Sequence, residues 1–417
     1  MKVLIWHGYL LGGTGSNVYT RSLARAWSRL GHEVVVFSQE PHPEAYDLGG
    51  AVHVRPEIDD PLPVFVLDRY EDLEARYLQD LSGEEREHFV EQNASAVREH
   101  LPADFLLTNH VLLGAPVGAA VGMPFTVKAH GSELEFSMRG NEELAAWARE
   151  TLAEAEEVVV GSNHIRDVLA EVVGWSERVR VVPPGVDVDE FRPEPRDRAL
   201  ARLLEESRRD PPRRSERDPD GGNAERLDEF LHAPEPTVVY VGKLSREKGV
   251  HVLLEALQQL DARAVIVGFG PARDELEAAA GERALFTGPL EHRHLVHLWP
   301  LADVSVMPSV FPEAFGMVAT EAAACGCPPL VALHSGMAAV AAGLAAEYPP
   351  EHRELVSFVS GDAVDLADKL ASLLTLPSSE RQTLSQAARR AAVEHWSWEN
   401  IAALLLSRGG RGPATEL

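Results

Sequence analysis

Short apolar segments alternate with segments of helical periodicity along most of this chain. At its start an apolar run, residues 2–7, is followed by a glycine-rich loop, 8–16, and then by a helical pattern over 18–30. Gly31 ends that pattern, and a second apolar run follows at 33–37. Because a helix that connects two buried strands makes them parallel, the alternation predicts α/β domains with doubly wound parallel sheets.

Further apolar runs continue this pattern and predict two domains. The chain has 417 residues, more than one core normally holds. Residues 193–236 are polar and rich in proline and charge, which predicts a flexible linker or insertion. We therefore expect one Rossmann-like domain over 1–192, a second over 237–396, and a frayed tail over 409–417. The other predicted strands are 105–108, 125–129, 157–160, 179–182, 237–241, 264–267, 284–286, 304–307 and 329–332.

Charge and cysteine content exclude several classes of protein. The net charge of −26, from 39 basic and 65 acidic residues, argues against binding to nucleic acid or to an anionic membrane surface. No apolar run approaches the roughly 20 residues of a membrane span, and the first run is too short for a signal peptide, so a cytoplasmic enzyme is expected. Cys325 and Cys327 suit neither a disulfide framework nor a zinc site, and we expect no metal.

Two glutamates, Glu313 and Glu321, lie where a predicted strand leads into a helix of small residues. Glu313 falls in the loop, where a carboxylate can accept hydrogen bonds from hydroxyls, and Gly316 lets a ligand approach the backbone. The amides that follow lie at the positive end of the helix dipole. Acids at a helix start are often merely solvated, but this combination favours a ligand that carries both hydroxyls and phosphates.

A cationic turn follows the predicted strand 237–241. Lysine is scarce in this chain, yet the turn holds Lys243 and Lys248 together with Arg246. Cations beside a helix start can neutralise a diphosphate without a metal ion. The alternative is a solvated turn, which is less favoured because the same sheet also supplies Glu313.

The first half contributes a glycine loop and a histidine. The loop contains Gly12, Gly13 and Gly15, but Val18 breaks the G-x-G-x-x-G spacing, which argues against a dehydrogenase. His130 follows a predicted strand and is a candidate polar contact, although a lone histidine is more often structural. Since ligands of doubly wound folds bind at the carboxyl ends of strands, a cleft between the domains would bring both sets of residues face to face. Three other histidines after predicted strands receive less weight: His7, His110 and His334.

In order and spacing these motifs resemble those of the retaining, nucleotide-sugar-dependent glycosyltransferases of the GT-B fold, family 4 type. That family includes sucrose synthases and bacterial mannosyl- and glucosyltransferases, and the resemblance spans nearly the whole chain. Its marks in the first half are Gly12-Gly13, Gly31-His32-Glu33-Val34, His130-Gly131-Ser132 and Pro184-Gly185-Val186-Asp187. Those in the second half are Gly242-Lys243-Leu244, Glu247-Lys248-Gly249, Glu313-Ala314-Phe315-Gly316 and Trp396-Ser397-Trp398-Glu399.

The resemblance implies roles along the donor. Glu313 would hold hydroxyls of the donor sugar, Glu321 would hold those of the ribose, and the backbone near Leu290 would meet the base. Backbone amides that would touch phosphate and sugar are those of Phe315, Gly316 and Met317.

It also implies which groups face the leaving diphosphate and the reaction centre. Lys248 and Lys243 would bind the diphosphate, Gly13 would approach the donor from the first domain, and His130 would contact the sugar at the reaction centre. The family usually has arginine where this chain has Lys243, and lysine lacks the bidentate guanidinium fork. Arg246 is therefore a candidate substitute.

The implied reaction transfers a hexosyl group from a nucleoside diphosphate sugar, by default a UDP-sugar, to an acceptor hydroxyl with retention of anomeric configuration. The leaving diphosphate would assist deprotonation of the acceptor, so the protein contributes positioning and electrostatic stabilisation, with no metal or other cofactor. The resemblance further implies that a helix over 397–408 packs back on the first domain, which would bind the acceptor.

Two other functions stay open. A nucleotide-sugar epimerase or hydrolase of the same fold would consume donor without an acceptor. A non-catalytic nucleotide-binding protein is disfavoured because the cationic and acidic positions are intact. The acidic composition favours a soluble small-molecule or saccharide acceptor over a membrane lipid.

Overall fold

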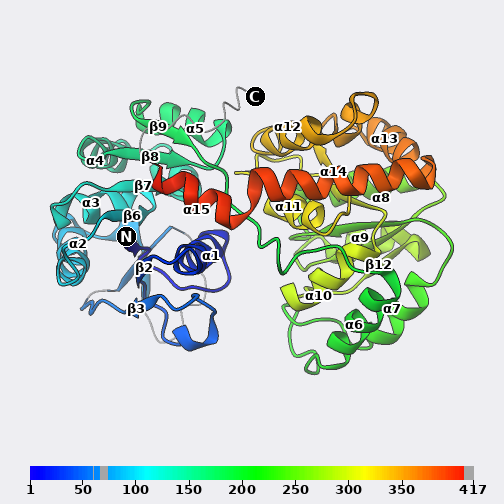
Figure 1. Cartoon of the computed structure of the whole chain (residues 1–417), viewed down its shortest axis with the longest axis horizontal. Helices are drawn as coiled ribbons and strands as arrows, with labels where there is room; N and C mark the ends of the chain where they lie inside the picture. Colours follow the sequence, from blue (N-terminus) through cyan, green and yellow to red (C-terminus); the bar gives the residue numbers. More distant parts are fainter. Residues whose placement is uncertain (60, 66–73, 408–417) are drawn as a thin grey trace. The chain divides into compact units, whose positions relative to one another are not determined.

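The computed structural model describes residues 1–59, 61–65 and 74–407, which form two compact units (Figure 1). The first unit consists of the described residues of 1–185 together with residues 398–407. The second unit spans Val186–Ser397. Each unit has a parallel sheet of its own, as the alternation of apolar and helical segments predicts.

The sheet of the first unit is parallel throughout, with strand order β3-β2-β1-β6-β7-β8-β9. Its central strands are rich in valine and leucine because both faces of the sheet are buried. A short parallel pair, β4 and β5, lies outside this sheet. The strands are β1 Lys2–Trp6, β2 Glu33–Phe37, β3 Val52–Val54, β4 Leu62–Val64, β5 Ala75–Tyr77, β6 Phe105–Asn109, β7 Thr126–Ala129, β8 Glu157–Val160 and β9 Val179–Val181.

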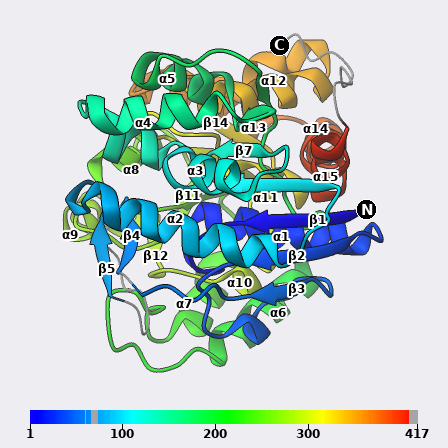
Figure 2. The same ribbon diagram turned by 90° about the vertical axis from the view of Figure 1, so that its left-hand side faces the viewer.

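Helices cover the two faces of this sheet. On one side α2, α3 and α4 lie next to one another (Figure 2). On the other side α1 packs against α15, the helix that returns to this unit, and the indole Nε1 of Trp27 donates a hydrogen bond to the carbonyl of Ala402 at 2.9 Å. The helices are α1 Gly15–Arg29, α2 Gly83–Arg98, α3 Val111–Val121, α4 Glu142–Leu152, α5 Asn163–Val173 and α15 Trp398–Leu406.

The second unit repeats the plan with strand order β12-β11-β10-β13-β14-β15, again parallel throughout. The order places β10 beside β13, so the segments that follow these two strands leave the sheet at the same edge. The strands are β10 Thr237–Val241, β11 Arg263–Val267, β12 Ala284–Phe286, β13 Val304–Met307, β14 Pro329–Ala332 and β15 Ser357–Phe358.

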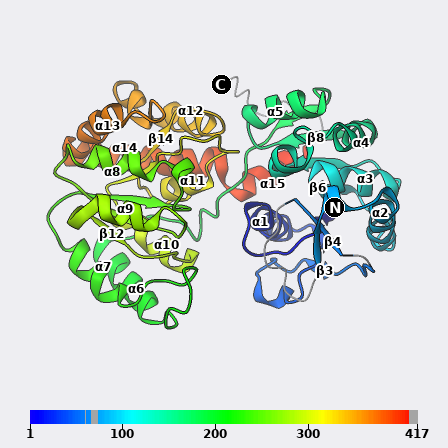
Figure 3. The ribbon, with the colours of Figure 1, turned by 180° about the vertical axis from the view of Figure 1, so that it is seen from behind.

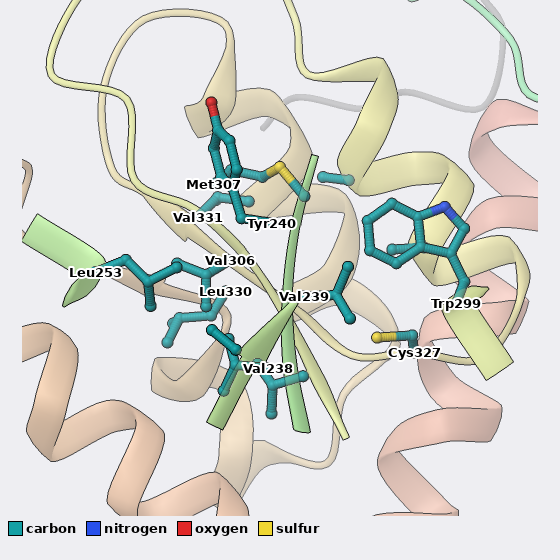
Figure 4. Packing of buried hydrophobic residues seen from close by; sticks show 14 of the residues in the cluster. Val238, Val239, Tyr240, Leu253, Trp299, Val306, Met307, Cys327, Leu330 and Val331 are labelled. Atoms are coloured by element: carbon teal, nitrogen blue, oxygen red, sulfur yellow. The ribbon is translucent and has the colours of Figure 1, made fainter. Parts of the chain in front are cut away.

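Apolar side chains from the sheet and its helices fill one continuous core in the second unit. Val239 of β10, Trp299 and Cys327 are part of it (Figure 4). Both cysteines are free and buried, as expected for small apolar residues. The helices are α6 Arg196–Arg208, α7 Asn223–Leu231, α8 Val250–Leu257, α9 Arg273–Ala280, α10 His292–Leu298, α11 Met317–Ala324, α12 Met337–Glu347, α13 Ala363–Thr375 and α14 Ser378–Trp396.

The prediction of a flexible linker over 193–236 is wrong for much of that segment. It contains α6 and α7, which pack on each other and bury Leu203 and Leu227 in the core of the second unit (Figure 3). The many charges lie on the exposed faces of these helices and in the loop between them, so composition alone obscured the amphipathic pattern. The second unit therefore begins at Val186, not at 237. The predicted tail, 409–417, lies outside the described residues.

Candidate active site

The loops after β10 and β13 meet at one edge of the second sheet, and there they join Lys248 to Glu313. Nζ of Lys248 lies 2.5 Å from Oε1 of Glu313. The side chains are 36% and 21% exposed, so the pair is open to a ligand. The loops are fastened to each other, because the amide of Val310 donates to the carbonyl of Glu247 at 2.9 Å. A Cβ at Gly249, where φ is +69°, would collide with the carbonyl oxygen of Pro308.

A short chain of hydrogen bonds holds the backbone of Glu313. Its amide donates to Oγ of Ser335 at 2.9 Å, and its carbonyl accepts from the amide of Gly336 at 2.9 Å. Oγ of Ser335 is 2.9 Å from Nδ1 of His334, whose Nε2 is 2.7 Å from the carbonyl of Ser309. His334 therefore helps to hold the loop that carries Glu313. Its position after a strand did not by itself indicate this role.

The segment Phe315–Met317 carries the chain from that loop into α11. Phe315 is buried and packs edge to face on Trp396, which fixes the loop on the core. Gly316 has a φ of +132°, and a Cβ there would lie 2.8 Å from Sδ of Met337. Met317 begins α11, so the amides of this segment lie at the positive end of its dipole.

Glu321 lies in the second turn of α11, and only 7% of it is exposed. Burial, together with the nearby Glu190, raises the pKa of Glu321 to about 8. His292, at the start of α10, has its Nε2 3.7 Å from Oε1 of Glu321. The raised pKa favours the protonated carboxyl, which can both donate hydrogen bonds to sugar hydroxyls and accept them.

The other cations of the turn are exposed. Arg246 pairs with Glu275 of α9 at 2.8 Å, and Lys243 points to solvent while its carbonyl accepts from the hydroxyl of Tyr240 at 2.9 Å. Leu290, between β12 and α10, is half-buried against the core. The structure thus brings Lys248 and Glu313 into contact. The other residues of the second unit that are predicted to contact the donor follow the carboxyl ends of β10, β12 and β13.

In the first unit three histidines stand immediately after three neighbouring strands. His7 follows β1, His110 follows β6 and His130 follows β7. The ring centroids of His110 and His130 are 4.7 Å apart, and those of His7 and His110 are 5.7 Å apart. The sequence analysis gave more weight to His130 than to His7 and His110. His7 and His110 could have been found from their positions at the ends of adjacent strands. The sequence does not give the order of the strands, however, so it does not show that these strands are adjacent.

Burial holds the pKa of His130 well below its ordinary value, with smaller effects from His110, Lys128 and His7. Nε2 of His130 lies 2.7 Å from Oδ1 of Asn109, whose amide nitrogen donates to the carbonyl of Trp6. Oδ1 of Asn109 can therefore only accept a hydrogen bond, so Nε2 of His130 carries the proton. Nδ1 is left as the acceptor nitrogen of a neutral imidazole.

A buried carboxylate, Glu133, ties the loops after β6 and β7 together. It accepts hydrogen bonds from Nδ1 of His110 at 3.3 Å and from the amides of His130 at 3.0 Å and Gly131 at 3.1 Å. Burial acts to raise the pKa of Glu133, but His110 and these hydrogen bonds hold it below its ordinary value. Close by, burial lowers the pKa of Lys128 to about 7, and its Nζ donates to the carbonyl of Val182.

The glycine loop between β1 and α1 leaves room for a ligand at one residue. Gly13 has a φ of +88°, and a Cβ there would meet no atom within 4 Å. At Gly12, in contrast, a Cβ would collide with the hydroxyl of Tyr46. The backbone at position 13 thus favours glycine, and the space beside it is open to a ligand.

The described part of the chain contains no group of three or more His, Cys, Asp or Glu side chains placed to hold a metal ion. Its helices likewise include none that is both long and apolar enough to cross a membrane.

Two family models match this chain. The model described as Glycosyltransferase Family 4 covers residues 13–190, and that described as Glycosyl transferases group 1 covers residues 224–391. The chain belongs to the glycosyltransferases of the family 4 type. The first match falls on the unit with the histidines, and the second falls on the unit with the Lys248–Glu313 pair.

Curated relatives of the family also match this chain. It is 30% identical over 277 residues to the D-inositol 3-phosphate glycosyltransferase of Xylanimonas cellulosilytica, a match that covers 62% of this chain and 57% of that one. The chain spans about half the length of the curated relatives that it matches.

Two solved structures show the fold. Anabaena Alr3699/HepE in complex with UDP is similar with a TM-score of 0.68 and 18% identity, over 97% of this chain and 98% of that chain. The sucrose-phosphate synthase of Thermosynechococcus elongatus gives 0.62 and 22%, over 97% of each chain. The chain therefore has the GT-B fold of two Rossmann-like domains.

Proposed function

We propose that the protein is a retaining glycosyltransferase that transfers a hexosyl group from a nucleoside diphosphate sugar, a UDP-sugar first, to the hydroxyl of a soluble acceptor. The observation that carries the proposal is the Lys248–Glu313 pair at the positive end of α11. It puts a cation for the diphosphate beside a carboxylate for sugar hydroxyls, in an edge of the sheet where ligands of this fold class bind.

Charge development on the leaving diphosphate is the step that the second unit would stabilise. Lys248 would neutralise the diphosphate oxygen that separates from the anomeric carbon, with Lys243 and Arg246 as further cations on the same turn. The amides at the start of α11 would add fixed dipoles that need no reorganisation during the reaction. Because these groups supply positive charge around the diphosphate, we propose that the reaction needs no metal ion.

The remaining contacts would orient the donor. Glu313 would accept hydrogen bonds from sugar hydroxyls, and a protonated Glu321 would exchange hydrogen bonds with the ribose, with the base toward Leu290. In the first unit His130 presents a neutral imidazole, which suits contact with an uncharged hydroxyl better than with an anion. Gly13 would allow the backbone to approach the donor.

The choice of donor and acceptor draws on the proteins that this chain resembles. The Anabaena structures contain UDP and UDP-glucose, and the curated relatives are named for D-inositol 3-phosphate. We therefore propose uridine nucleotides as the first donors to test and a hydroxyl-rich small molecule as the first acceptor. The negative charge of the chain and the absence of a spanning helix among its described residues are consistent with a cytoplasmic location.

The test is a donor panel. Release of nucleoside diphosphate is measured from UDP-, GDP- and ADP-glucose, with and without EDTA, and with or without inositol 3-phosphate. We expect slow release from UDP-glucose that EDTA does not change and that an acceptor accelerates. Lys248→Ala should abolish this release. Lys369→Ala, which removes a lysine of α13 that pairs with Glu354, should not change it. Failure of all donors to bind or react would refute the proposal, and equal release with every acceptor would favour a hydrolase.

A further inference from the structure

The loop between α6 and α7 lies directly on the carboxyl end of β12. The amide of Asp220 donates to the carbonyl of Thr287 at 2.8 Å, and Nδ2 of Asn223 donates to the same carbonyl at 2.9 Å. A Cβ at Gly288 would lie 3.0 Å from the carbonyl of Asp218 and from Oδ1 of Asp220. The loop and the strand end are thus in contact, with no room for a side chain between them (Figure 3 shows α7, β12 and α9).

Asp220 anchors this loop through three arginines. It is 8% exposed, accepts two hydrogen bonds from Arg273, and lies 2.8 Å from Arg213 and 3.6 Å from Arg226. Arg273 begins α9, immediately after the segment that follows β11, so the anchor joins the loop to two neighbouring strand ends. Arg273 also donates to Glu277 of α9 at 2.7 Å, so two carboxylates and three guanidinium groups meet at the base of the loop.

Arg217, at the exposed tip of the same loop, lies over an aromatic ring of the donor edge. Its guanidinium carbon is 5.7 Å from the centroid of the Phe269 ring, in the segment that follows β11. That segment continues the edge on which the donor is proposed to bind, because the amide of Leu244 donates to the carbonyl of Phe269 at 2.8 Å, and the amide of Gly268 donates to that of Gly288 at 3.0 Å.

The nucleoside end of the proposed donor points toward this corner. Glu321, the proposed ribose contact, lies 3.7 Å from His292, and His292 begins the helix that follows Leu290. A ribose at Glu321 therefore has its base near residues 288–292. Gly288, the first of those residues, lies against Asp218 and Asp220 of the loop.

We propose that residues 213–220, held in place by Asp220, form one wall of the base subsite and that Arg217 determines base selectivity. A guanidinium has only hydrogen-bond donors, so it suits the carbonyl oxygens of uracil or guanine and not the exocyclic amine of adenine. The loop that the sequence predicts to be a linker thereby becomes part of the donor site. This inference rests on the proposed function.

The test measures dissociation constants of UDP, GDP and ADP by calorimetry for the full chain and four variants. Arg217→Ala should lower the preference for UDP over ADP by about tenfold, since its charge-assisted hydrogen bond to the base is lost. Asp220→Asn should have a similar effect, because it weakens the contacts that hold the loop in place. The matched controls are Arg208→Ala, at the exposed end of α6, and Asp228→Asn, on the exposed face of α7, and both should keep the wild-type ratio.

The outcomes separate this inference from the proposed function. If the wild type binds UDP but neither Arg217→Ala nor Asp220→Asn changes the ratio, the inference is overturned and the function stands. A uniform weakening of all three nucleotides also overturns it, because the loop then only supports the fold. Since Arg217 is exposed, its variant should fold even where Asp220→Asn does not. A wild type that binds no nucleotide overturns the proposed function, and this inference with it.

Discussion

Nζ of Lys248 and Oε1 of Glu313 are 2.5 Å apart although 65 residues separate them in the chain. Each residue satisfies the charge of the other before any donor is present. A bound diphosphate sugar would separate the pair. The lysine would then contact the diphosphate, and the glutamate would contact the sugar hydroxyls. The two residues should therefore fail in different ways when they are replaced.

Glu313→Gln should lower turnover by about 100-fold while the dissociation constant of UDP changes little, because the amide loses the charge that orients sugar hydroxyls. Lys248→Ala should weaken UDP binding as well as turnover, since its charge faces the diphosphate. Steady-state kinetics and calorimetry distinguish the two. Equal losses of nucleotide affinity in both variants would contradict this division of roles.

Glu321→Gln should stabilise the ligand-free protein at neutral and alkaline pH. A raised carboxyl pKa means that the folded state holds a proton that the unfolded state releases above about pH 4.5, so the wild type loses stability as pH rises toward 8. The gain in the free energy of unfolding should be near zero at pH 4 and reach up to about 3 kcal/mol at pH 7. Denaturant unfolding at several pH values measures it, and a gain independent of pH would rule out this titration.

Nucleotide affinity offers a second measure of Glu321. Glu321→Ala removes both the donor and the acceptor that we assign to the ribose, so UDP should bind about tenfold more weakly. The turnover of bound donor should change less than it does in Glu313→Gln. If Glu321→Ala binds UDP as the wild type does, the ribose assignment is wrong.

Glu133→Gln should lower turnover about tenfold with a smaller effect on KM, because the carboxylate positions His130 and His110 through charge-assisted hydrogen bonds. Glu135→Gln, two residues along and exposed, is the matched control and should behave as the wild type. The pH–rate profile of the wild type should lack an inflection from His130 near pH 6.5, since its pKa is far lower. Such an inflection, lost in His130→Ala, would refute the neutral imidazole.

Trp27→Phe should destabilise the protein by about 1–2 kcal/mol more than Trp299→Phe does. Both indoles are fully buried, but Nε1 of Trp27 donates to Ala402 of α15, whereas Nε1 of Trp299 has no hydrogen-bond partner among the described residues. The first replacement loses a buried hydrogen bond between α1 and α15, and the second costs mainly packing. Chemical denaturation of both variants checks the difference, and equal losses would show that this bond contributes little.

The strand ends were predictable because apolar runs of four or five residues with helices between them fix where each strand stops. That is why Glu313, Lys248 and His130 could be proposed from their positions after strands. The helix near 397–408, in contrast, was implied by the family resemblance. The segment 193–236 could not be predicted in the same way. Its charged residues dominate the composition, while the few buried ones, such as Leu203 and Leu227, define α6 and α7.

Periodicity along the chain reports which side chains are buried, and so the sequence by itself determined two parallel α/β sheets and the residues at their carboxyl ends. It does not report which strands are neighbours. Only the tertiary structure decided that β10 lies beside β13, which joins Lys248 to Glu313, and that β1, β6 and β7 are adjacent, which gathers three histidines around Glu133. The same holds for Asp220, whose arginine partners come from three separate segments and meet only because the loop folds onto β12.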